Sequence, residues 1–150
     1  MASPVLTVLL VDDNLDILSS YAAWLRDEEG FHVLTAANGA EGLQIIAQQP
    51  PDCVVIDVMM PELNGYQLVR ALRGDPASTA IPLIILTALT QEKDRLAGIF
   101  SCVDQYLVKP VKPGALAEAI RAAMTITADE REARWRTQLG GPRELRYQRD

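Results

Sequence analysis

Short apolar runs alternate along residues 1–124 with stretches in which apolar residues recur every three to four positions. Apolar runs of this length are typical of buried strands, whereas the three-to-four-residue period is typical of helices that bury one face. Strands that alternate with helices indicate βαβ units and therefore a parallel sheet. The predicted strands are residues 5–11, 32–36, 53–57, 83–86 and 105–108. The predicted helices are approximately residues 15–29, 40–48, 64–74, 92–100 and 114–124. In the first of these helices, Asn14 is the expected N-cap and Gly30 the expected stop.

Most of the apolar runs end in a polar residue, and these residues are Asp12-Asp13, Asp57, Thr87 and Lys109. In an open α/β sheet, ligands bind outside the carboxyl ends of the strands. If the strands lie side by side, three carboxylates, a hydroxyl and an ammonium meet in one pocket. Crowded carboxylates need a compensating cation, and a hard ion with oxygen ligands such as Mg²⁺ supplies it. Lys109 adds a positive charge for a phosphoryl oxygen, so the pattern predicts a magnesium and phosphoryl site.

Residues 125–150 form a different segment. The β-branched run Thr125-Ile126-Thr127 is unfavourable inside a helix, so we expect a break near residue 126. A short helix over about residues 128–139 and a disordered tail would follow. The alternative is one continuous helix over residues 114–139.

The predicted tail helix places Trp135 and Leu139 on one face, because they are four residues apart. Trp is an effective anchor at interfaces. Trp135 therefore either anchors an interface or packs on the body of the chain, and the sequence leaves both possibilities open.

Composition and charge exclude several classes of protein. The net charge is −6 and the acidic excess lies in residues 1–124, which argues against direct nucleic-acid binding. There is no apolar run long enough for a membrane span and no secretion signal at the N-terminus. Cys53 and Cys102 form no metal-binding or redox motif, so we interpret them as reduced thiols of a cytoplasmic protein. His32 is the only histidine, which leaves no histidine-based metal centre.

A family resemblance rests on the residues at the strand ends and on those that follow them. These are Asp12-Asp13, the segment from Asp57 to Gly65 (DVMMPELNG), Thr87-Ala88 and Lys109-Pro110. In type, order and spacing they resemble the response-regulator receiver domain of two-component signal transduction. The resemblance covers about residues 5–124 and implies a flavodoxin-like α/β fold. That fold is a doubly wound, five-stranded parallel sheet of order 2-1-3-4-5 with helices on both faces. Residues 1–124 would then be the receiver domain, and residues 125–150 a C-terminal helical extension.

The resemblance also implies a role for each site residue. Asp57 would be the phospho-acceptor, and Lys109 would contact the phosphoryl group. Thr87 and Tyr106 would form the switch, and the Lys109–Pro110 peptide bond would be cis. Mg²⁺ would be bound by Asp12, Asp13, Asp57 and the backbone carbonyl of Met59.

The implied function is a phosphorylation-activated response regulator, which takes its phosphoryl group from a sensor histidine kinase or a phosphotransfer protein. Its output would be a downstream protein target or homodimerisation. The dimer contact would be either the tail helix or the face formed by residues 92–100, 105–108 and 114–124. Such a chain is not an enzyme for an external substrate, since it catalyses only its own phosphorylation and slow autodephosphorylation.

Other interpretations of the chain are weaker. A constitutive interaction module that no longer uses the switch is disfavoured, because all the site residues are present. An aspartate-based phosphatase would need a second Asp after its nucleophile, and Val58-Met59-Met60 supplies none. We expect a stand-alone receiver, with a piece of a longer protein as the alternative.

Two positions depart from the family pattern. Cys102-Val103 replace the usual Gly-Ala pair, so the geometry of the turn before residues 105–108 is in doubt. Leu89 is apolar where a polar group could orient attacking water, which predicts slow autodephosphorylation.

Overall fold

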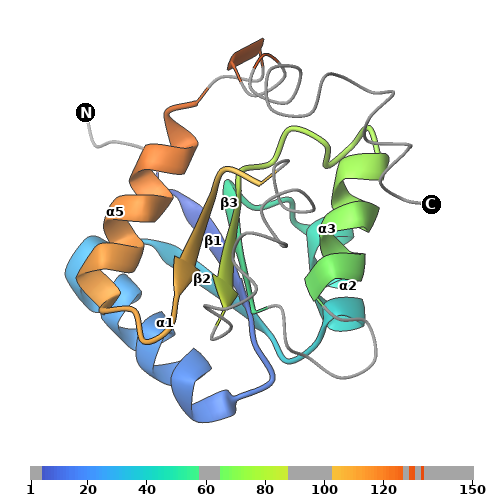
Figure 1. Ribbon diagram of the computed structural model, residues 1–150. Coiled ribbons are helices and arrows are strands. Elements are labelled where there is room, and N and C mark those ends of the chain that lie inside the picture. Colours follow the sequence, from blue (N-terminus) through green and yellow to red (C-terminus); the bar gives the residue numbers. More distant parts are fainter. Residues whose placement is uncertain (1–4, 58–64, 88–102, 127–128, 131–132, 134–150) are drawn as a thin grey trace.

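The computed structural model of the chain describes residues 5–57, 65–87, 103–126, 129–130 and 133. Its centre is a 5-stranded sheet of order β2-β1-β3-β4-β5 (Figure 1), and every strand pair is parallel. The strands are β1 (Thr7–Val11), β2 (His32–Ala36), β3 (Cys53–Asp57), β4 (Leu83–Thr87) and β5 (Gln105–Val108). The fold class and the strand order expected from the sequence are confirmed.

The described helices are α1 (Leu15–Glu29), α2 (Gly39–Gln48), α3 (Gly65–Gly74) and α5 (Pro113–Met124). They match the predicted segments to within a residue, and the predicted helix over residues 92–100 lies outside the described residues. The first strand was predicted two residues too long, because Val5 and Leu6 are exposed and β1 begins at Thr7.

None of the described helices is long and apolar enough to cross a membrane.

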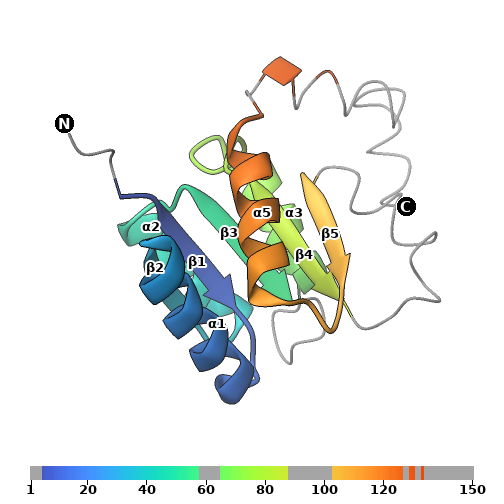
Figure 2. The same cartoon turned by 90° about the vertical axis from the view of Figure 1, so that its left-hand side faces the viewer.

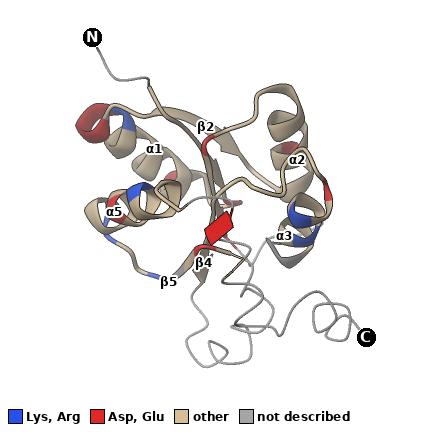
Figure 3. Ribbon diagram, turned by 90° about the horizontal axis from the view of Figure 1, so that it is seen from above, with Lys and Arg blue, Asp and Glu red and all other residues tan. Residues whose placement is uncertain are grey.

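The helices cover the sheet from both sides. Viewed from above, α1 and α5 lie on one side of the sheet and α2 and α3 on the other (Figure 3). Along β1, Val8 and Leu10 pack toward α1 and α5, whereas Leu9 and Val11 pack toward α2 and α3. Burial on both faces explains why the strands are continuous apolar runs rather than alternating patterns.

Local signals set the ends of α1 as predicted. The Asn14 side chain accepts hydrogen bonds from the backbone N–H groups of Asp16 and Ile17, both at 3.1 Å. These bonds satisfy donors that have no partner within the helix. At the other end, Gly30 has φ 70°, a left-handed conformation in which other residues are strained.

A glycine inside α2 allows that helix to approach β1 closely. A Cβ atom at Gly42 would lie 3.3 Å from Val11 Cγ2, which is tighter than an ordinary van der Waals contact. The helix therefore packs directly on the strand that leads into Asp12. This contact explains why α2 has a glycine in its interior, although glycine has a low intrinsic helix propensity.

The C-terminal extension is described at few positions. α5 ends at Met124, and the N–H groups of Thr125 and Ile126 donate to the carbonyls of Ala122 and Ala123, respectively. Thr125 and Ile126 are not helical, as expected for a break near residue 126, whereas Asp129, Glu130 and Ala133 are helical. The predicted helix over residues 128–139, with Trp135 and Leu139, otherwise lies outside the described residues.

A buried charge pair fixes the amino edge of β4. The Asp104 carboxylate accepts a hydrogen bond from the Leu83 N–H at 2.7 Å and lies 3.5 Å from the Arg73 guanidinium. Arg73 also donates to the carbonyls of Thr79 and Ile81, at 2.9 and 2.7 Å. These contacts join the end of α3, the start of β4 and the residue before β5.

We predict that Asp104→Ala lowers the free energy of unfolding by about 3–5 kcal/mol, because it leaves the charge of Arg73 buried beside an empty space. Chemical denaturation monitored by circular dichroism measures this loss. Asp52→Ala is the matched control, since Asp52 also accepts a strand-start N–H, that of Thr7 at 2.8 Å, but is exposed. The free energy of unfolding of Asp52→Ala should fall by less than about 1 kcal/mol. Equal losses in the two variants would contradict the idea that burial makes the Asp104 contact important.

Candidate functional site

The sheet register brings the predicted site residues to one edge. Val11 pairs with Ile56, so Asp12 and Asp57, the next residues along, lie side by side. Thr87 pairs with Val108, which puts Lys109 just beyond Thr87. All the strands run in the same direction, so their carboxyl ends share this edge of the sheet (Figure 2).

Three carboxylates gather there, as the sequence predicted. Oxygen atoms of Asp12, Asp13 and Asp57 lie within 4.8 Å of one another. Asp12 and Asp57 are 4% and 5% exposed, whereas Asp13 is exposed. Asp12 Oδ1 accepts a hydrogen bond from the Asn14 N–H at 2.9 Å. Asp12 Oδ2 is buried and accepts no hydrogen bond from the described residues.

Lys109 reaches this cluster from the end of β5. Its ammonium Nζ donates to Asp57 Oδ2 at 3.0 Å and lies 3.6 Å from Asp12 Oδ2. Its backbone N–H donates to the Thr87 carbonyl at 2.7 Å, which anchors the residue to β4. The Lys109–Pro110 peptide bond is cis, as the resemblance implied.

The electrostatics of the pocket are unbalanced. Burial raises the pKa of Asp12 above its ordinary value of 3.8, and the Asp57 carboxylate raises it further, against the Asn14 N–H and the charge of Lys109. Burial alone would lower the pKa of Lys109, but the hydrogen bond to Asp57 and the charges of Asp57 and Asp12 outweigh it. The pKa of Lys109 therefore lies above its ordinary value of 10.5, and the ammonium stays charged at neutral pH.

The donor set fits a hard divalent cation. Three carboxylates in one cluster offer only oxygen ligands, which is the chemistry that Mg²⁺ prefers. One buried oxygen, Asp12 Oδ2, has no hydrogen-bond donor among the described residues, and a single ammonium cannot neutralise three carboxylates. The remaining predicted ligand, the Met59 carbonyl, lies outside the described residues.

The structure describes only part of the two predicted switch residues. Thr87 ends β4 and is 1% exposed. Tyr106 lies in β5, where its Cα pairs with that of Ile85, but its side chain is outside the described part of the chain. Leu89, which flanks the site in sequence, is outside it as well.

A groove lies beside Lys109, and no motif of the sequence indicates it. It has a volume of about 630 Å³ and is bordered by α1 residues, among them Asp16 and Tyr21, and by the segment from Lys109 to Pro113. Tyr21 lies in α1, and its ring packs against the core. Its hydroxyl donates to the carbonyl of Val111, 90 positions away in sequence, and no local pattern signals a contact of this range.

Comparison with known proteins decides the family. A family model for the response regulator receiver domain matches residues 8–121. The chain belongs to this family. Receiver domains act in two-component signalling as signalling modules rather than as classical enzymes.

Individual relatives show how much of the chain the family accounts for. The receiver domain is 38% identical over 117 residues to Protein PilH of Pseudomonas aeruginosa, covering 78% of this chain and 96% of PilH. It is 39% identical to the transcriptional regulatory protein PrrA of Mycobacterium tuberculosis, covering 78% of this chain but only 49% of PrrA.

Solved structures agree with the fold. The chemotaxis response regulator CheY4 of Vibrio cholerae matches with a TM-score of 0.73 at 29% identity, over 80% of this chain and 99% of CheY4. The receiver domain of the sensor histidine kinase PA1611 from Pseudomonas aeruginosa matches with a TM-score of 0.71 at 28% identity, over 81% of this chain and 99% of that domain. That second structure has a magnesium ion coordinated in its active site cleft.

We predict that Asp12→Asn stabilises the metal-free receiver domain at pH 7, by roughly 1 kcal/mol, because it removes a buried charge next to Asp57. Since the pKa of Asp12 is raised on folding, its carboxyl favours folding most at low pH, and this contribution is lost as the pH rises through the folded-state pKa. The advantage of the Asn variant should therefore shrink as the pH falls toward 4. Denaturant titrations in a chelating buffer between pH 7 and 4.5 measure it, and a less stable variant at pH 7 would refute the assignment.

Proposed function

We propose that this receiver domain is a phosphorylation-activated response regulator in which Asp57 accepts a phosphoryl group. The observation that carries the proposal is the contact of 3.0 Å between Lys109 Nζ and Asp57 Oδ2, inside a cluster of three carboxylates. An ammonium held at a nearly buried carboxylate occupies the place where a phosphoryl oxygen would need a positive partner.

The reaction needs little covalent chemistry from the protein. An Asp57 oxygen attacks the phosphorus atom, a new oxygen–phosphorus bond forms, and the bond between phosphorus and the donor breaks. Lys109 moves its ammonium from the carboxylate to an oxygen of the arriving group and neutralises charge there. Catalysis of this kind depends on positioning and electrostatic stabilisation. The product is an acyl phosphate on Asp57.

We propose Mg²⁺ as the cofactor, with Asp12, Asp13, Asp57 and the Met59 carbonyl as its ligands. The fit of the oxygen donors supports this choice, as does the magnesium ion in the PA1611 receiver domain. When bound, the ion would supply charge neutralisation for the carboxylates and the phosphoryl oxygens. The chain's own contribution is to hold the Asp12 and Asp57 carboxylates close together.

Thr87 and Tyr106 are the proposed switch. Thr87 is buried at the end of β4, next to the strand that ends at Asp57, so its hydroxyl is placed to move toward a phosphoryl oxygen. Tyr106 would rotate inward into the space that Thr87 leaves. Phosphorylation would then shift the population toward the active state by as much as the phosphoryl group favours that state.

The proposed phosphoryl donor is a sensor histidine kinase or a phosphotransfer protein, and the output is protein contact rather than nucleic-acid binding. Homodimerisation through residues 92–124 or through the tail is the other form of output. Light scattering with Mg²⁺ and beryllofluoride, a phosphoryl mimic, separates the two. A rise from monomer to dimer indicates dimerisation as the output. A constant monomer points to docking on another protein, and a constant dimer points to the tail as a permanent interface.

We predict that acetyl phosphate plus Mg²⁺ adds one phosphoryl group to the wild-type chain and none to Asp57→Asn, because the amide is not a nucleophile for phosphorus. Intact-mass spectrometry measures the addition. Asp52→Asn is the control, since Asp52 is an exposed carboxylate outside the cluster and should be labelled like the wild type. If the wild type takes up no phosphate, the chain is a constitutive interaction module instead.

We also predict slow autodephosphorylation, which Leu89→Asn or Leu89→Glu should accelerate several-fold, because a polar side chain can orient water for attack on the acyl phosphate. Loss of the phosphorylated mass with time measures the rate. Leu89→Met keeps the side chain apolar and serves as the control. Equal rates in all the variants would contradict the role assigned to position 89.

A further inference from the structure

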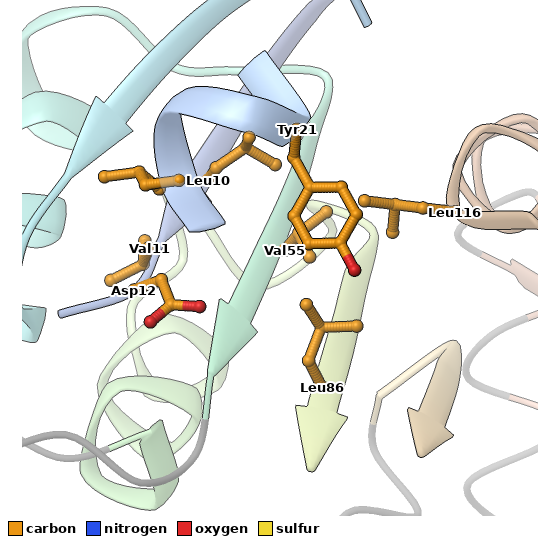
Figure 4. A pocket seen from close by; sticks show the side chains of 8 residues that line it. Leu10, Val11, Asp12, Tyr21, Val55, Leu86 and Leu116 are labelled. Atoms are coloured by element: carbon orange, nitrogen blue, oxygen red, sulfur yellow. The ribbon is translucent and has the colours of Figure 1, made fainter. Parts of the chain in front are cut away.

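Tyr21 connects α1 to the segment that follows the site lysine. Its ring packs against the core on the α1 and α5 side of the sheet. It also borders a cavity of about 10 Å³ together with Asp12 and apolar side chains from the strands and α5. Figure 4 shows the ring projecting from α1 between Leu116 and Val55, with its hydroxyl on the side of Leu86. The ring is therefore partly buried against apolar neighbours, and its hydroxyl needs a polar partner.

That partner is the backbone of the loop between β5 and α5. The Tyr21 hydroxyl donates to the Val111 carbonyl at 2.5 Å. Val111 is two residues after Lys109 and one residue before Lys112, the N-cap of α5, which makes no side-chain capping bond. Among the described residues, no other side chain is hydrogen-bonded to the backbone of residues 110–112.

Lys109 depends on this loop for its position. On its strand side, its backbone N–H is fixed by the Thr87 carbonyl. On its loop side, the Val111 side chain packs against the core, the Lys112 carbonyl accepts a hydrogen bond from the Leu116 N–H at 3.0 Å, and the Val111 carbonyl accepts one from the Tyr21 hydroxyl. A lysine has a flexible stem and no rigid fork, so the place of its ammonium depends on a backbone that is fixed on both sides.

We propose that Tyr21 is a positioning residue for phosphoryl transfer, whose hydroxyl holds residues 110–112 so that the Lys109 ammonium stays at Asp57. This inference rests on the proposed function of Asp57 as the phospho-acceptor. Tyr21 touches neither the phosphoryl group nor the metal in this scheme. It acts through the Val111 carbonyl and the backbone of Lys109.

The test is Tyr21→Phe, which keeps the packed ring and removes only the hydroxyl. The rate of phosphorylation by acetyl phosphate should fall about tenfold, since small errors in placing a catalytic group reduce rates strongly. The dissociation constant for Mg²⁺, measured by titration of the metal alone, should stay within twofold of the wild type, because the carboxylates are untouched. If Tyr21 merely supported the fold, its loss would not lower the phosphorylation rate while leaving the Mg²⁺ dissociation constant unchanged.

Ser78→Ala is the matched control. The Ser78 hydroxyl is also buried and also donates to a backbone carbonyl, that of Leu72 at 2.8 Å, but it lies at the amino end of β4, away from Lys109. This variant should lose a similar amount of stability and keep both the phosphorylation rate and the Mg²⁺ affinity.

Three results overturn the inference. The first is phosphorylation of Tyr21→Phe at the wild-type rate. The second is a loss of Mg²⁺ affinity in Tyr21→Phe in proportion to its loss of rate. The third is an equal slowing of phosphorylation in Ser78→Ala. If the wild-type chain itself is not phosphorylated, the proposed function is wrong, and the proposed role of Tyr21 is then wrong as well. Slow labelling of Tyr21→Phe beside normal labelling of the wild type and of Ser78→Ala confirms the inference.

Discussion

The charges at the carboxyl edge of the sheet are the constraint from which most of this structure follows. Asp12 and Asp57 are almost fully buried beside each other, and one ammonium lies between them and the groove. Burial and repulsion both disfavour this arrangement, as the raised pKa of Asp12 shows. A fold can keep such a cluster only if the remaining elements fix it in place.

The opposite edge of the sheet supplies that rigidity. There, Arg73 and Asp104 form a buried pair whose hydrogen bonds reach the start of β4 and the loop before it. Because the buried ion pair is also bonded to backbone groups of three residues, moving one of the segments that it joins would break several contacts at once. The sheet is thus firmly joined at its amino edge and electrostatically unbalanced at its carboxyl edge. This asymmetry fits the proposed switch, in which the carboxyl edge changes while the amino edge stays in place.

The sequence predicted those parts of the molecule that depend on local patterns. Apolar runs marked the strands, Asn14 and Gly30 marked the ends of α1, and the polar residues at strand ends converged because parallel strands share an edge. The contacts of Tyr21 with Val111 and of Arg73 with Asp104 could not be predicted. Each joins residues that are far apart in the chain, and Tyr and Arg on a helix usually serve ordinary packing or solvation.

Other predictions depend on residues beyond the described part of the chain. The Met59 carbonyl, the Tyr106 side chain, Leu89 and the tail helix with Trp135 belong to this group. Their roles rest on family resemblance and on chemistry, and the experiments above address the site directly. The turn that contains Cys102-Val103 is described only from Val103, a buried residue of the core on the α2 and α3 side. Val103 therefore contributes to packing at a position where the family usually has a small residue.

The close contact between Gly42 and Val11 limits how this chain can diverge. α2 has no part in the chemistry, so its sequence would be expected to drift freely between related proteins. At position 42, however, any larger residue would press on Val11 Cγ2, 3.3 Å from where its Cβ would stand, and Val11 immediately precedes Asp12. A change at position 42 would therefore require the Val11 side chain to shift by a few tenths of an ångström or to be replaced by a smaller one. In this way the packing of α2 on β1 limits which residues can stand beside the acidic cluster in related chains.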